Sequence, residues 1–74
     1  MRRADKTPTT INAGDRLTCR YDGGAPFVQE GRSYTVNRVY NNGNGRAVEV
    51  EELPDRLIPA WRFRAYDPAR DRAA

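Results

Sequence analysis

The chain has 74 residues, a net charge of +3, one cysteine and no histidine. This length supports one domain with a small core. The lack of histidine excludes Ser-His and Cys-His nucleophile pairs and most zinc sites, and a single cysteine excludes an intramolecular disulfide. We therefore expect a protein that is not an enzyme and that uses no metal or cofactor.

Basic residues exceed acidic ones by thirteen to ten, and twelve of the basic residues are arginine. A GC-rich coding genome is the favoured explanation of this excess of arginine over lysine, and recognition of phosphate or of an acidic surface is the alternative. No apolar run reaches the length of a signal peptide or a membrane span. We therefore expect no membrane partner and a location in a reducing cytoplasm.

Residues 1–13 carry several charged and threonine residues with few strongly apolar ones, among them Ile11, and are predicted to form a flexible N-terminal arm. The first strand is predicted over Arg16–Tyr21, where Leu17, Cys19 and Tyr21 alternate with polar residues. Cys19 falls on the apolar face of this strand, so we expect a small buried residue there rather than a reactive thiol.

A turn-rich loop follows, anchored by Phe27 and Val28, and leads into the clearest strand, Ser33–Tyr40. Val36 and Val39 fall on opposite faces of a regular strand. A bulge near Asn37-Arg38 would bring them to the same face.

The segment from Asn41 to Gly45 is the strongest hairpin signal, because Asn-Gly pairs accept the positive φ angles of tight turns. A third strand is predicted over Ala47–Val50, a turn around Pro54, and a fourth strand at Leu57-Ile58. Pro59–Arg62 suits one 3₁₀ turn before a fifth strand, Phe63–Tyr66. Residues 67–74 are predicted to form a flexible charged tail.

This order of elements over residues 14–66 resembles SH3-like barrels, in which a Leu-Ile-Pro strand enters one helical turn before the last strand. Here that segment is Leu57-Ile58-Pro59. The resemblance implies an all-β, five-stranded SH3-like barrel with one 3₁₀ turn before the last strand and flexible termini. Gly14-Asp15, Gly31–Val36 and Arg62-Phe63 are also similar to motifs of small phage-encoded proteins.

Recognition of proline-rich peptides does not follow from this resemblance. The groove of signalling SH3 domains needs an aromatic residue where this chain has Arg62, and a tryptophan where it has Arg46-Ala47. Trp61 is displaced by one position.

Trp61 is open to two interpretations: it caps one end of the barrel, or it stays partly exposed and anchors a partner. The second interpretation leads to our first functional hypothesis, a non-enzymatic protein-interaction module. If the chain is phage-encoded, the partner would be a host protein. The expected partner-binding residues are Phe27, Trp61, Arg62, Arg64 and Tyr66.

The alternative hypothesis is a nucleic-acid-binding barrel with an arginine-aromatic patch. If Arg62 continues into the last strand, Arg62 and Arg64 share its outward face while Phe63 points inward. If that strand neighbours the first, a basic patch forms. The expected residues are Arg2, Arg3, Arg16, Arg20, Arg62 and Arg64. Arginines interleaved with the acidic stretch from Glu49 to Asp55 would instead favour a protein partner. The oligomeric state is left open.

Overall fold

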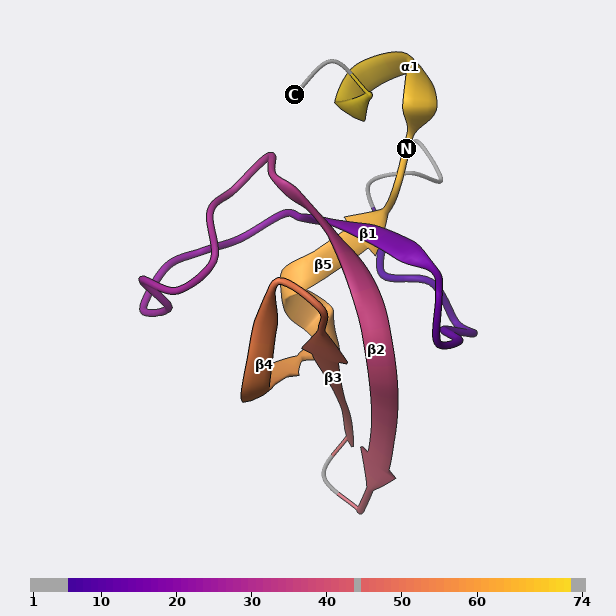
Figure 1. The fold of residues 1–74 in the computed structure, drawn as a ribbon, viewed down its shortest axis with the longest axis vertical. Helices are drawn as coiled ribbons and strands as arrows, with labels where there is room; N and C mark the ends of the chain where they lie inside the picture. The colour runs from indigo at the N-terminus through magenta and orange to yellow at the C-terminus, as the bar shows by residue number, and fades with distance from the viewer. Residues whose placement is uncertain (1–5, 44, 73–74) are drawn as a thin grey trace.

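The computed structural model describes residues 6–43 and 45–72, and its strands form one five-stranded antiparallel sheet (Figure 1). The elements in chain order are β1 (Arg16–Cys19), β2 (Ser33–Asn42), β3 (Gly45–Val50), β4 (Leu53–Pro59), the 3₁₀ turn η2 (Ala60–Arg62), β5 (Phe63–Ala65) and α1 (Pro68–Asp71). Their order across the sheet is β4-β3-β2-β1-β5. The all-β class and the 3₁₀ turn before the last strand are confirmed. Within the described residues the sheet does not close, so the barrel stays a prediction.

The long strand β2 is curved and pairs with β1 near its start and with β3 near its end (Figure 1). Its register against β3 shifts between Val36 and Arg38, which confirms the predicted bulge. The extra residue lets Val36 be buried while Val39 also packs against the core. The turn predicted around Pro54 is wrong, because Pro54 lies inside β4, which begins at Leu53.

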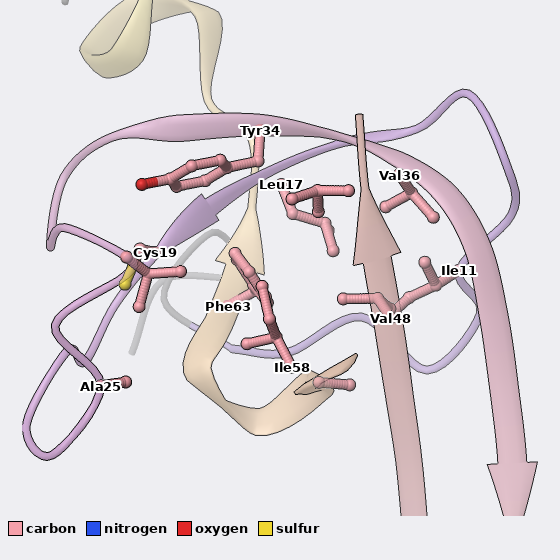
Figure 2. Packing of buried hydrophobic residues seen from close by; sticks show 12 residues of the cluster. Ile11, Leu17, Cys19, Ala25, Tyr34, Val36, Val48, Ile58 and Phe63 are labelled. Carbon is pink, nitrogen blue, oxygen red and sulfur yellow. The ribbon is translucent and has the colours of Figure 1, made fainter. Parts of the chain in front are cut away.

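The core receives side chains from every strand, from η2 and from the loop between β1 and β2 (Figure 2). Phe63 is fully buried at its centre and meets the ring of Tyr34 edge-on, with the ring centroids 5.9 Å apart. Cys19 is buried, as predicted, and burial raises the pKa of its thiol. The buried apolar set is Ile11, Leu17, Cys19, Ala25, Val28, Tyr34, Val36, Val48, Val50, Ile58, Ala60 and Phe63.

Residues 6–13 pack against the sheet, which differs from the flexible arm predicted for residues 1–13. The Thr7 hydroxyl donates a hydrogen bond to the Phe63 carbonyl at 2.8 Å, and the Ala65 amide donates to the Lys6 carbonyl. The arm thus covers the free edge of β5, and Ile11 enters the core. The edge of β5 has backbone groups that need hydrogen-bond partners. The polar composition of the arm does not predict that it supplies them. Residues 1–5 lie outside the described part.

The tail predicted over residues 67–74 also differs from expectation where it is described. Asp71 in α1 is buried and forms an ion pair with Arg64 of β5 at 2.8 Å. The Thr18 hydroxyl and the Asp67 amide donate to the same carboxylate. These bonds hold α1 against β1 and β5, because a buried carboxylate needs partners. Residues 73–74 lie outside the described part.

The two sheet edges are poor sites for pairing with another strand. The arm covers β5, and the free edge of β4 includes Pro54 and Pro59. Asp55, between them, has a φ of 66° in the left-handed region, and its amide donates to the Glu49 carboxylate. Prolines and irregular backbone are common protections of edge strands. Both described edges are therefore protected against pairing with an added strand.

Replacing Ile11 by alanine tests the packing of the arm. We expect Ile11→Ala to lower the free energy of unfolding by about 2–3 kcal/mol, because it opens a cavity in a small core. Thr10→Ala, at an exposed neighbouring position, is the control and should change it by less than about 0.5 kcal/mol. Equal, small effects in urea unfolding would show that the arm does not contribute to the core.

Asp71→Asn tests the buried ion pair. Hydrogen bonds from Arg64 hold the pKa of the Asp71 carboxyl below its ordinary value of 3.8. The Asp71 carboxyl thus binds a proton more readily in the unfolded chain than in the folded protein. The ion pair therefore stabilises the fold at pH values above 3.8, and this stabilisation is lost as the pH falls further. We expect Asp71→Asn to cost about 2 kcal/mol at pH 7, with the gap to wild type narrowing steadily below pH 3.8. A gap of constant size between pH 7 and pH 2 in urea titrations would contradict this account.

Candidate interaction surface

The turn η2 decides which side chains near the end of the sheet face the core and which face outward. Ile58 and Ala60 are buried before Trp61, and Phe63 is buried after it. Pro59, with φ −55°, leads into the turn, and the Phe63 amide donates to the Ala60 carbonyl. Because one tight turn separates two buried residues, Trp61 is directed outward and is 48% exposed. Trp61 is therefore partly exposed rather than buried as a cap, and its role as an anchor stays a prediction.

Trp61 packs against Tyr21, which follows the end of β1. Their ring centroids lie 5.6 Å apart at an interplanar angle of 34°. The backbone here is also tied across the sheet, because Arg20 Nε donates to the Trp61 carbonyl at 2.8 Å and the Arg20 amide donates to the Arg62 carbonyl. These bonds continue the pairing of β1 with β5 and hold the two rings together.

Arg62 joins η2 to the loop between β1 and β2. Its guanidinium carbon lies 4.6 Å from the centroid of the Trp61 ring and 5.7 Å from that of Tyr21. Its Nη1 donates to the Gly23 carbonyl at 2.8 Å. Nε is buried and makes no hydrogen bond within the described residues, so the cation–π contacts must offset that cost. The planar guanidinium thus fixes the loop against both rings.

Two grooves flank Trp61. One is lined by Cys19, Arg20, Tyr21, Glu30, Gly31, Trp61, Arg64 and Arg70. The other is lined by Thr7, Gly45, Arg46, Ala47, Leu57, Pro59, Ala60 and Trp61. We use the name Trp61 surface for the side chains of Tyr21, Leu57, Pro59, Trp61 and Arg62.

The structure brings together only part of the predicted protein-binding set. Trp61 and Arg62 touch, but Phe27 is half-buried beneath Arg56, whose guanidinium carbon lies 4.4 Å from its ring centroid. Tyr66 is half-buried elsewhere, 5.3 Å from the guanidinium of Arg16.

The expected outward position of Arg64 is wrong. Only 8% of this residue is exposed, and its guanidinium donates to both carboxylate oxygens of Asp71. The partner of Arg64 comes from α1, an element that the sequence did not predict. Arg62 lies in η2, within the predicted 3₁₀ turn, so the two arginines do not share one face of a strand.

The alternative, nucleic-acid-binding set is also divided. Arg16 donates to the Thr35 hydroxyl, and the Thr35 amide donates to the carboxylate of Glu52. Arg20 shares its groove with Glu30. With Arg64 paired to Asp71, the arginines are interleaved with acids. Arg2 and Arg3 lie outside the described residues.

Two exposed residues were missed by the sequence argument. Tyr21 was expected on the apolar face of the first strand, but β1 ends at Cys19 and Tyr21 is 51% exposed. Leu57 is 57% exposed beside the fully buried Ile58. The exposure of Leu57 could have been predicted, because two adjacent apolar residues in a strand point to opposite faces.

Comparisons with protein-family models, with curated proteins and with solved structures gave no match to this chain. Among residues 6–43 and 45–72, no cluster of three or more histidine, cysteine or acidic side chains is placed to hold a metal ion. Nor is any helix in these ranges long and apolar enough to span a membrane. The functional argument therefore depends on the surface geometry.

Arg62→Lys tests whether the guanidinium holds the loop. Lysine keeps the charge, but it lacks the planar guanidinium that contacts the rings of Tyr21 and Trp61 and donates several hydrogen bonds. We expect faster hydrogen exchange at the Ala25 and Val28 amides, which close the turns of this loop. Arg38→Lys, at an exposed position on β2, is the matched control. Unchanged exchange in Arg62→Lys would show that the loop does not depend on Arg62.

Proposed function

We propose that the protein is a small SH3-like barrel that acts as a non-enzymatic protein-interaction module. The strand order β4-β3-β2-β1-β5 and the position of η2 between β4 and β5 support the fold assignment. Similarity to small phage-encoded proteins supports a host protein as the partner, met in the host cytoplasm. Fold alone assigns no function, so the interaction is argued from the Trp61 surface.

The observation that carries the proposal is a cluster of exposed apolar side chains. The described residues expose four large hydrophobic side chains, and three of them, Tyr21, Leu57 and Trp61, lie around η2. Covering exposed apolar area with a partner removes it from water, which favours association. Clusters of this kind often mark interaction sites in small soluble proteins.

The chemistry of the cluster suits a binding anchor. Tryptophan, tyrosine and arginine are the residues most enriched among those that dominate binding energy. Contacts with Tyr21 and Arg62 already restrict the Trp61 ring. A restricted ring has less conformational entropy to lose on binding. The Trp61 surface is therefore preorganised for a partner.

Phe27 and Tyr66 take a smaller part in this proposal than the sequence suggested. Each is half-buried and lies beside an arginine away from the Trp61 surface. Phe27 also packs against the core, so its substitution would disturb folding. We assign binding to Tyr21, Leu57, Trp61 and Arg62.

Nucleic acid is the weaker candidate. Binding of a phosphate backbone needs several arginines on one accessible face. Arg64 is buried against Asp71, and Arg16 and Arg20 lie among acids. Stacking of bases on Trp61 remains the feature that such a ligand would use.

A comparison of partner capture by the wild-type protein and by Trp61→Ala tests the proposed function. We expect the variant to lose at least about tenfold in the recovery of a partner from bacterial lysate, because it removes the central anchor. Asn37→Ala, exposed at the bulge of β2, is the control and should match wild type. Circular dichroism and thermal unfolding should show that both variants are folded.

Equal recovery of the same partner by wild type and a folded Trp61→Ala variant would refute the assigned surface. Recovery that depends on Trp61 but is abolished by nuclease treatment of the lysate would favour the nucleic-acid alternative.

A further inference from the structure

The Tyr21 ring packs against Trp61 from a place that lies over residue 23, which has no side chain. We infer that Gly23 is a positioning residue of the Trp61 surface: it seats the Tyr21 ring, and through that ring it restricts Trp61. This inference rests on the proposed function, in which Trp61 is the anchor, and it identifies what controls the rigidity of that anchor.

The Tyr21 ring lies directly against the backbone of Gly23. A β-carbon at residue 23 would overlap the Tyr21 hydroxyl, and it would lie 2.6 Å from Cζ and 3.0 Å from Cε1 of the ring. Carbon atoms in contact prefer separations of about 3.5–4.0 Å. The ring therefore keeps this place only above a glycine, the residue that allows such a close approach to the backbone.

Arg62 fixes the backbone on both sides of this seat. Its Nη1 donates to the Gly23 carbonyl at 2.8 Å and, over a longer distance of 3.4 Å, to the Tyr21 carbonyl. The amide of Arg20, just before Tyr21, donates to the Arg62 carbonyl at 2.7 Å. The ring's own residue and its seat are thus tied to one residue of η2. A side chain at position 23 would therefore move the ring rather than the loop.

The ring can move outward without disturbing the core. Tyr21 is 51% exposed and is not one of the buried core residues, so its rotation into solvent displaces no core side chain. The φ angle of Gly23 lies outside the left-handed region, so alanine fits this backbone. Alanine also restricts the unfolded chain more than glycine does. Gly23→Ala should thus change the surface without weakening the fold.

Displacement of the Tyr21 ring would loosen Trp61. The two ring centroids lie 5.6 Å apart, and the Arg62 guanidinium carbon contacts the Trp61 ring as well, 4.6 Å from its centroid. Without the Tyr21 contact, more of the indole meets solvent and its rotation is less restricted. A less restricted side chain has more conformational entropy to lose on binding, which weakens binding.

Gly23→Ala tests the inference, and Gly43→Ala is the matched control. The φ angle of Gly43 also lies outside the left-handed region, and a β-carbon there would meet no heavy atom of the other described residues within 4 Å. We expect the acrylamide quenching constant of Trp61 to rise by roughly half in Gly23→Ala, because the displaced ring no longer shields one side of the indole. Gly43→Ala should match wild type. Neither variant should lower the urea midpoint.

Binding is measured with the same variants. Recovery of the partner that wild type captures from bacterial lysate should fall about threefold in Gly23→Ala, because the looser anchor loses more entropy on binding. Gly43→Ala should recover the partner as wild type does.

Tyr21→Ala shows whether Gly23 acts through the ring. With no ring to seat, adding Gly23→Ala to Tyr21→Ala should change neither quenching nor recovery, since two changes that act through one contact are not additive.

Each other outcome overturns a defined part of the account. Unchanged quenching in Gly23→Ala, a urea midpoint below that of Gly43→Ala, or a further rise in quenching in the Tyr21→Ala background would each overturn the inference. Raised quenching with undiminished recovery of a partner that Trp61→Ala fails to recover would also overturn it and leave the proposed function intact. Equal recovery by wild type and Trp61→Ala, or no recovery by wild type, would count against the proposed function instead, and the quenching results would still decide whether Gly23 seats the ring.

Discussion

The turn from β4 through η2 to β5 is the constraint on which the rest of the structure depends. It must place Ile58, Ala60 and Phe63 in the core within six residues. A 3₁₀ turn achieves this in three residues, and its geometry leaves Trp61 outside. Burial of Phe63 and exposure of Trp61 are thus two consequences of one backbone path. The exposed Trp61 ring and the core are therefore coupled, since a change that turned Trp61 inward would displace a core residue.

Three arginines connect separate segments of the molecule. Arg62 ties η2 to the loop after β1, Arg64 ties β5 to α1, and Arg46 ties β3 to the N-terminal arm. Arg46 and Arg62 reach segments distant in sequence, and Arg46 and Arg64 each donate through two guanidinium nitrogens. A chain this small has limited apolar surface to bury, and these bonds hold the segments that a larger core would hold. Part of the arginine excess is therefore structural.

The sequence predicted the local features well because local chemistry determines them. Alternation located the strands, the Asn-Gly pair located the hairpin, and the phase slip after Val36 located the bulge. It did not predict the Arg64–Asp71 pair, because α1 is too short to show a periodic pattern and the pair depends on Thr18, 53 residues away. Of the candidate site, Trp61 and Arg62 were predicted together. Tyr21 was not, because its exposure follows from where β1 ends. Leu57 was missed although its place beside Ile58 in one strand gave a signal.

The central claim is that Trp61 is held outward as a rigid, accessible ring, and it is the single tryptophan of the chain. Tryptophan fluorescence of the native protein measures both properties at once, as quenching by acrylamide and as time-resolved anisotropy. The account predicts quenching about half as efficient as in the unfolded chain, because Trp61 is 48% exposed, together with a ring that rotates only with the whole molecule. A native tryptophan protected from acrylamide, or one that rotates freely on the nanosecond scale, would contradict it.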